Sequence, residues 1–385
     1  MKRTIAVVMA VFMLLMGVVA CTASDKPAET SASGVIKIGA TGPLTGGAAI
    51  YGQACANGAA IAVEEINALG GLQFELKYED DVHDVEKAAN AYNALKDWGA
   101  QITLGSVTSD PAKVTSALCY EDGIFFLTPS ASAATVTEGK DNVFQMCFID
   151  PTQGIAGANY IKDKNLGTKV AVIYKNDEDY STYIYQNFAA EAEKIGLNIV
   201  STTTFTADSQ NDFSVQLGDA QAAGADLIFL PMYYEPASLI LAQANQMGID
   251  ITFFGVDGMD GILEMNGFDK SLAEGVILMT AFDANASDEN TKSFVKKYQE
   301  KYGEIPNQFA ADAYDCVYAI YQACVNGNVT ADMTAQQINE IMKQQFTSMT
   351  FNGLTGQNMT WGTDGRVSKD AIAVVIKNGA YASMD

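Results

Sequence analysis

Short apolar runs alternate with longer helical patterns along most of the chain, from Val35 to Lys377. The runs are rich in β-branched and aromatic residues, which is typical of strands. The expected strands are Val35–Ala40, Phe74–Asp80, Gln101–Gly105, Ile124–Pro129, Lys169–Tyr174, Leu197–Phe205, Asp226–Pro231, Ile251–Gly255, Val276–Thr280 and Ala371–Lys377. The stretches between them repeat apolar residues at helical spacing. The expected helices are Tyr51–Ala68, Val85–Trp98, Pro111–Asp122, Ser181–Ile195, Phe213–Ala223, Pro236–Met247, Asn290–Tyr302 and Gln308–Val325.

Strands that alternate with helices indicate βαβ units, in which parallel sheets are covered by helices on both faces. Two such series follow each other along the chain, so we expect an α/β fold with two doubly wound lobes. Ligands of open α/β sheets bind beyond the carboxyl ends of the strands. The loops that follow strands, at a cleft between the lobes, are therefore where we expect a site.

The N-terminus has the pattern of an export signal. Lys2 and Arg3 precede an apolar run from Ile5 to Ala20, which is short for a membrane span of ~20 residues. Val18-Val19-Ala20-Cys21 resembles the lipobox of bacterial lipoproteins, so residues 1–20 are the expected signal peptide and Cys21 the expected lipidation site. The alternative is an ordinary signal followed by an unrelated Cys. Residues 21–34 then form the lipidated Cys and a flexible tether, because they are small and polar.

Composition agrees with an exported, globular protein. The 385 residues suit two domains, and a net charge of −23 disfavours nucleic acid and anionic lipid as partners. No second apolar run is long enough to span a membrane. Of the six cysteines, Cys21 is assigned to lipid. The remaining five are an odd number among mostly apolar neighbours, so we expect buried thiols.

Two post-strand loops are suited to an anion. Ser109 opens a helix, where exposed N–H groups and the positive end of the helix dipole attract a carboxylate; simple helix capping is the alternative. The loop from Thr128 to Ser132 ends the neighbouring strand with hydroxyl groups, and a polar turn is its alternative. A Gly-rich bend before Tyr51 lacks the spacing of a phosphate-binding loop, so we expect it to pack closely at the cleft.

Two further loops are suited to the rest of a small ligand. Tyr233 and Tyr234 are adjacent aromatics in a surface loop, where they can stack on a ligand. Asp257 lies between glycines with no Lys or Arg within ten residues on either side. Such a carboxylate in a cleft attracts an ammonium group, and an Asx-turn is the alternative.

Enzyme and metal signatures are weak. His83 is the single His, in the acidic loop from Asp80 to Asp84, where we expect it to be solvated at the surface. A His-based catalytic pair would have to use it, and a metal site that needs several His is excluded. We therefore expect no catalytic residue, metal or cofactor.

Taken together, the loops and their order resemble the leucine/isoleucine/valine-binding proteins of ABC importers, which have the type I periplasmic binding protein fold. The resemblance spans most of the mature chain, and no single motif decides it. The stretches that carry it are IKIGATGPLTG, AVEEINALGG, YEDD, YEDGIFFLTPSAS, PMYYEP, FFGVDG, FAADAYDCVYA and LTGQNMTWGTDG.

The resemblance implies a three-segment hinge, with passages near Ile149–Asp150, Thr280–Asp283 and Gly356–Trp361. One lobe would comprise residues 35–149 and 283–357, and the other residues 150–282 and 358–385. The same resemblance implies roles for residues of this chain. Ser109, Ala131 and Ser132 would hold a ligand carboxylate, Asp257 would hold its ammonium, and Tyr51, Tyr180, Tyr233 and Phe309 would line or close the pocket.

Some members have a disulfide between the acidic loop and the loop before the binding Ser, but the matching positions here are His83 and about Thr108, so that bridge cannot form. The implied function is capture of a free amino acid, branched-chain or otherwise apolar, by a monomer held on the outer face of a bacterial membrane. Delivery to ABC permease subunits would follow. An amino-acid or amide sensing receptor subunit is the alternative, followed by an exported hydrolase.

Overall fold

The computed structural model describes residues 34–384, which form one compact unit. The expected signal peptide, the expected lipidation site Cys21 and most of the tether lie outside the described residues. No helix within residues 34–384 is long and apolar enough to cross a membrane.

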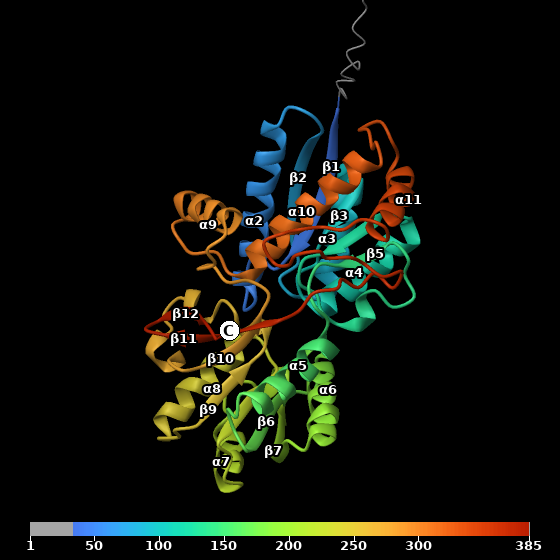
Figure 1. Ribbon diagram of the computed structural model, residues 1–385. Helices are drawn as coiled ribbons and strands as arrows, with labels where there is room; N and C mark the ends of the chain where they lie inside the picture. The colour runs from blue at the N-terminus through green and yellow to red at the C-terminus, as the bar shows by residue number, and fades with distance from the viewer. Residues whose placement is uncertain (1–33, 385) are drawn as a thin grey trace, which may run out of the picture. The chain divides into compact units, whose positions relative to one another are not determined.

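The first sheet has five parallel strands in the order β2-β1-β3-β4-β5. Its strands are β1 (Val35–Gly42), β2 (Gln73–Asp80), β3 (Ile102–Leu104), β4 (Phe125–Thr128) and β5 (Val143–Gln145). Figure 1 shows these strands in the upper half of the molecule, together with helices from both ends of the chain. These helices are α2 (Ala49–Ala68), α3 (Val85–Trp98), α4 (Ser109–Asp122), α9 (Glu289–Tyr302), α10 (Gln308–Asn326) and α11 (Ala335–Phe346). We call this half lobe 1.

The second sheet has seven strands in the order β12-β11-β10-β9-β8-β6-β7. Its strands are β6 (Lys169–Lys175), β7 (Asn198–Phe205), β8 (Leu227–Leu230), β9 (Thr252–Gly255), β10 (Ile277–Thr280), β11 (Ile372–Lys377) and β12 (Ala380–Ser383). All are parallel except β11 and β12, which run antiparallel to their neighbours at one edge. Helices α5 (Asp150–Asp163), α6 (Asp179–Ile195), α7 (Ser214–Ala222) and α8 (Tyr234–Gln246) accompany this sheet in the lower half of Figure 1. We call this half lobe 2.

The chain passes three times between the lobes: from β5 to α5, from β10 to α9, and before β11. The third passage was expected near residues 356–361, but it comes later in the chain. Trp361 donates its indole N–H to the carbonyl of Gln145 at 2.8 Å, and buried Lys369 contacts Asp312 of α10 at 2.8 Å. The stretch around Trp361 therefore still packs on lobe 1.

Every expected strand and helix is present, and four elements were not expected. The additional elements are α5, α11, β5 and β12. Helix α5 contains Gly154 and Gly157, which disfavour a helix in isolation. A Cβ at Gly154 would overlap the backbone of Ile184, so the glycine lets α5 pack closely against α6. The five cysteines that the structure describes are free and buried, as expected.

Candidate functional site

The two lobes meet at the points where their strand orders reverse. In lobe 1 the reversal lies between β1 and β3, and in lobe 2 between β6 and β8. Loops after such strands lead in opposite directions and leave a crevice. Tyr51 and Ser109 follow the first pair of strands, and Tyr180 and Tyr233 follow the second pair. Topology alone therefore brings these four residues to facing edges of the two sheets.

Asp257 is a buried acidic residue of this region. It follows β9 in a short 3-10 turn, and only 4% of its surface is exposed. The Tyr180 hydroxyl donates to its Oδ1 at 2.5 Å, and its own N–H donates to Oε1 of Gln153 at 3.1 Å. The amide of Gln308 donates to its carbonyl at 3.0 Å. The bond from Tyr180 orients the carboxylate, and the other two hold the backbone of Asp257.

The protonation of Asp257 is set by burial. Desolvation raises the pKa of this carboxyl to about 7, and the hydrogen bond from Tyr180 opposes the rise. Among the described residues, no Lys, Arg or His lies within ion-pair distance of it. A buried carboxylate without a cation is costly, so a positively charged ligand group would be favourable here.

Aromatic rings surround this carboxylate. Tyr180 stacks on Tyr233 with ring centroids 4.5 Å apart. Tyr51 lies 5.6 Å from Tyr233 and 4.3 Å from Phe309. The four aromatic residues expected at the site therefore form one continuous wall drawn from both lobes.

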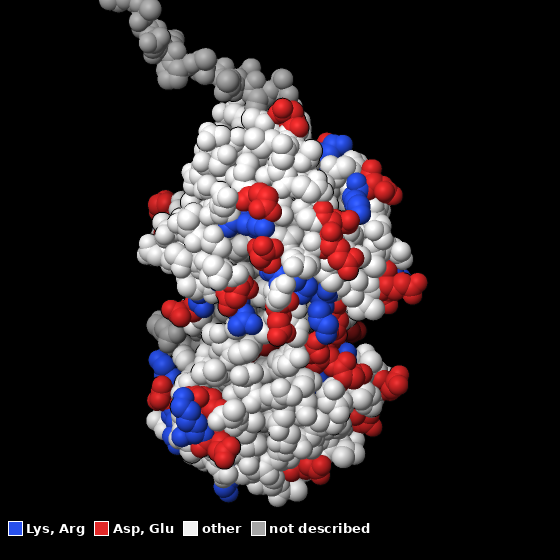
Figure 2. Space-filling view, turned by 90° about the vertical axis from the view of Figure 1, so that its right-hand side faces the viewer, with Lys and Arg blue, Asp and Glu red and all other residues white. Residues whose placement is uncertain are grey.

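Tyr51 also ties the lobes together directly. Its hydroxyl donates to the carbonyl of Gly258 and accepts from the N–H of Tyr234 at 3.1 Å. Tyr51 belongs to α2 of lobe 1, whereas both partners belong to lobe 2. Lys113 and Asp179 form a further ion pair between α4 and α6. Figure 2 shows acidic and basic side chains intermingled around the waist between the two halves.

The expected carboxylate-binding residues are all buried in lobe 1. Oγ of Ser109 accepts from the N–H of Ala133 at 3.2 Å, so it does not cap α4 and can still donate. The hydroxyl of Ser132 has no hydrogen-bond partner. The N–H of Ala131 is already used by Thr128 at 3.0 Å. Ser109 therefore offers a hydroxyl donor, and Ser132 offers a second one beside the carboxylate of Asp150, whereas the amide of Ala131 is occupied.

Two polar residues at the start of α5 were missed by the sequence reasoning. Asp150 is buried, and its N–H donates to the carbonyl of Ser132 at 3.0 Å. Burial raises the pKa of Asp150 well above its usual range; the Ser132 hydroxyl beside its carboxylate opposes the rise, and the charge of Asp257 adds to it. Gln153, one helical turn later, carries an unpartnered Nε2. The Asp-Pro at the beginning of this helix was a sequence signal for its first turn.

His83 corrects our expectation of a solvated surface residue. Its imidazole is only 29% exposed, and Nδ1 lies 2.8 Å from Oγ1 of Thr108. These are the two positions at which some similar proteins have a disulfide. A hydrogen bond joins the two loops here instead.

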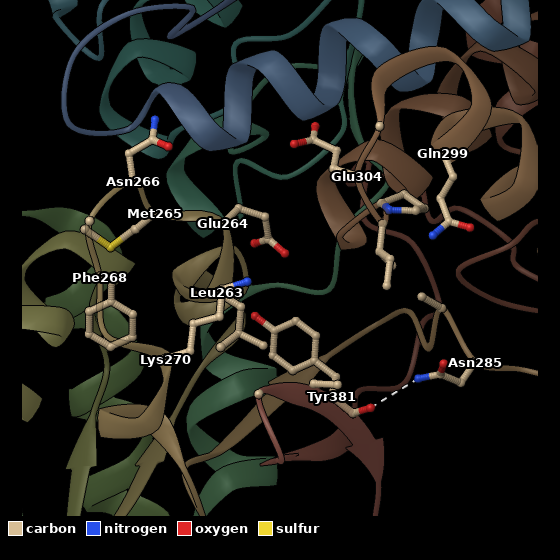
Figure 3. Close-up of a pocket in the computed structure, with 17 residues that line it drawn as sticks. Leu263, Glu264, Met265, Asn266, Phe268, Lys270, Asn285, Gln299, Glu304 and Tyr381 are labelled. Atoms are coloured by element: carbon tan, nitrogen blue, oxygen red, sulfur yellow. Dashed lines mark hydrogen bonds between the residues drawn. The ribbon is translucent and has the colours of Figure 1, made fainter.

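A separate cavity lies away from these residues. It has a volume of about 600 Å³ and is lined by residues 263–268, the end of α9 and the β11–β12 turn, and none of the expected site residues lines it. In Figure 3 the carboxylates of Glu264 and Glu304 and the ring of Tyr381 face this space. Burial raises the pKa of Glu264 to about 8. This cavity has carboxylates on its walls, whereas the interlobe cluster combines carboxylates with hydroxyl donors and aromatic rings.

No group of three or more His, Cys, Asp or Glu within residues 34–384 is arranged to hold a metal ion.

Comparison with solved structures supports the fold. The leucine-binding protein LivK from Thermotoga maritima has a TM-score of 0.82 and 28% identity, over 91% of this chain and 98% of that chain. The branched-chain amino acid transporter substrate-binding protein LivJ from Streptococcus pneumoniae, solved with isoleucine, has a TM-score of 0.82 and 29% identity over the same shares.

Sequence comparison gives the family. A leucine-, isoleucine-, valine-, threonine- and alanine-binding protein from Pseudomonas aeruginosa is 27% identical over 293 residues, which are 75% of this chain and 78% of that protein. The family model described as periplasmic binding protein matches residues 35–380. With its two doubly wound lobes and its cluster of side chains between them, this chain belongs to the periplasmic binding protein family.

Proposed function

We propose that this chain is the extracytoplasmic substrate-binding component of an ABC importer and captures a free amino acid between its lobes. The observation that carries the proposal is the carboxylate of Asp257, which is buried among aromatic rings without a cation. A ligand ammonium supplies the missing charge. Names of similar proteins, which refer to leucine, isoleucine and valine, support the same class of ligand.

The opposite end of the ligand is a carboxylate in this proposal. The hydroxyl groups of Ser109 and Ser132 donate to it from lobe 1, near the N-terminus of α4. Such a helix end favours negative charge. Each charge-assisted hydrogen bond contributes about 1.5–3 kcal/mol.

The side chain of the ligand is apolar in this proposal. Tyr51, Tyr233 and Phe309 present aromatic surface between the lobes. Apolar area removed from water contributes about 25 cal/mol per Å², so a branched aliphatic side chain gains more than a small or polar one. We therefore place leucine, isoleucine and valine first among the ligands.

Binding and closure are coupled because the ligand contacts come from both lobes. Asp257 belongs to lobe 2, and Ser109 and Ser132 belong to lobe 1. A ligand that binds both sides stabilises the closed arrangement relative to an open one. The closed form is the one presented to the permease, and no catalysis is part of the proposal.

The binding assay is thermal unfolding of the chain from Ser24 to Asp385 with each standard amino acid. A ligand at about 100 times its Kd stabilises the protein by about 2.7 kcal/mol. We expect the largest rise in melting temperature with a branched-chain amino acid. Asp257→Asn is the matched control, because it keeps the shape and removes the charge. No rise with any amino acid would overturn the proposal.

The membrane anchor is tested separately. Lipid on Cys21 would hold the full-length chain at the outer face of the membrane. Cys21→Ser should therefore release the protein into the soluble fraction after expression in a bacterial host. Retention of the Cys21→Ser variant in the membrane fraction would contradict lipid anchoring.

A further inference from the structure

The loop that carries His83 is held in an unfavourable backbone conformation. Val82 and His83 have φ values of 53° and 58°, in the left-handed region. A β-branched residue such as Val82 rarely adopts that conformation. The carboxylates of Asp80 and Asp81 accept from the N–H groups of Val82 and His83 at 2.9 Å and 3.0 Å. Such strain persists only where the surroundings fix it, and it is concentrated at functional sites.

This conformation places the imidazole between the lobes. Nδ1 of His83 lies 2.8 Å from Oγ1 of Thr108 in lobe 1. Nε2 lies 3.7 Å from Oε1 of Glu178 in lobe 2. The ring also lies edge-on against Tyr233, with centroids 5.6 Å apart and planes at 86°. His83 therefore contacts lobe 2 at an acidic group and at an aromatic wall of the proposed site.

Glu178 is suited to receive this contact. Its side chain is only 4% exposed, Lys175 contacts Oε1 at 3.2 Å, and Oε2 has no hydrogen-bond partner. Glu178 is also the residue immediately before α6, two positions ahead of Tyr180. A contact that fixes Glu178 therefore also fixes the turn that aims the Tyr180 hydroxyl at Asp257.

We propose that His83 is a positioning residue of the amino-acid site, which joins Thr108 of lobe 1 to Glu178 of lobe 2 and so favours the closed arrangement. The proposal rests on the proposed function, because it assigns His83 a role in retaining the ligand. In this proposal His83 does not contact the ligand carboxylate or ammonium. Its two nitrogens have separate tasks: Nδ1 orients the ring on lobe 1, and Nε2 reaches lobe 2.

Two substitutions separate these tasks. His83→Asn places an amide where Nδ1 stands, so the bond to Thr108 is kept and the contact with Glu178 is lost. His83→Gln has the length to reach the position of Nε2 and restores a donor toward Glu178. Lys96→Met is the control, because it removes an ion pair to Asp122 within lobe 1.

The first measurement is closure without ligand. Spin labels on Tyr120→Cys in lobe 1 and Val215→Cys in lobe 2 report the distance between the lobes by pulsed electron paramagnetic resonance. Both positions are exposed, whereas the five cysteines that the structure describes are buried, so the labels attach to the introduced thiols. The second measurement is amino-acid affinity by calorimetry.

We expect His83→Asn to shift the distance distribution toward longer values and to raise the Kd about threefold, the size of a weak, partly exposed polar contact. His83→Gln should restore both, and Lys96→Met should change neither. Glu178→Gln weakens the same contact and also removes the ion pair to Lys175, so it should shift both quantities in the same direction as His83→Asn. Adding His83→Asn to Glu178→Gln should change them less than His83→Asn does alone, because the contact is already weakened.

Unchanged distances and affinity in His83→Asn would overturn the proposal. So would equal loss in His83→Asn and His83→Gln, since that result assigns the effect to local folding of the loop. If the unmodified chain binds no amino acid, the proposed function fails, whereas the distance measurement still decides whether His83 joins the lobes.

Discussion

The raised pKa of Asp257 predicts that amino-acid binding strengthens as pH rises. The ligand ammonium pairs with the ionised carboxylate, and burial raises the pKa of that carboxyl to about 7. As pH falls through this value, the unliganded site takes up a proton and loses the form that binds. The direction is therefore fixed: affinity is lower at pH 6 than at pH 8.

The magnitude follows from the ionised fraction. With a pKa of about 7, the carboxyl is about one-tenth ionised at pH 6 and about nine-tenths ionised at pH 8. The Kd should therefore fall about tenfold between these two values, which corresponds to about 1.4 kcal/mol. At pH 7 the site should release about half a proton for each ligand bound.

Calorimetry in buffers of different ionisation enthalpy measures both the affinity and the proton release. Asp257→Asn is the control: it should weaken binding by about 2 kcal/mol or more and remove the proton release that Asp257 causes. An equal Kd at pH 6 and pH 8 without proton release would refute the reasoning. The ammonium would then not be paired with Asp257.

Three further predictions concern the site and its supporting structure. Tyr180→Phe removes the 2.5 Å hydrogen bond to Asp257. The pH at which binding is half lost should therefore rise, and calorimetry should show binding weaker by about 1.5 kcal/mol. An unchanged pH midpoint would contradict the role of this bond. Lys369→Met leaves the carboxylate of Asp312 buried without its partner, and urea unfolding should report a loss of about 3–5 kcal/mol, whereas full stability would show that the ion pair is dispensable. The added methyl group of Gly58→Ala would overlap the carbonyl of Ala310 and lower the melting temperature. Gly218→Ala has open space in α7, so it should raise the free energy of unfolding by about 0.5–1 kcal/mol. Equal melting temperatures for the two variants would contradict the packing argument.

The periodicity of the sequence was enough to predict the alternating architecture. Most expected strands are apolar runs, and the central ones, such as Leu227–Leu230, are buried on both faces of the sheet. Such strands can be predicted from the sequence alone, because a short continuous apolar run between turns is typical of a buried strand. Helix α5 was missed for the opposite reason. Its glycines weaken the local helical signal, and the close contact with α6 that Gly154 permits exists only after folding.

The site residues likewise fall into those that the sequence identified and those that it did not. Asp257 was identifiable from the sequence because an acidic residue stands between glycines after an apolar run, with no basic neighbour. Asp150 was not identifiable, since its carboxylate becomes a buried group only where the passage from β5 to α5 meets Ser132. The contact between His83 and Glu178 joins residues 95 positions apart, across two lobes.

The sequence by itself determined the alternation of strands and helices, the acidic character of the chain and the loops proposed to hold a ligand. These properties depend on local composition and spacing, which neighbouring residues along the chain express directly. Only the tertiary structure decided which loops face each other, which carboxylates lose water and which side chains bridge the lobes. Burial and cross-lobe contact depend on strand order and on the passages between lobes, and no local pattern encodes either.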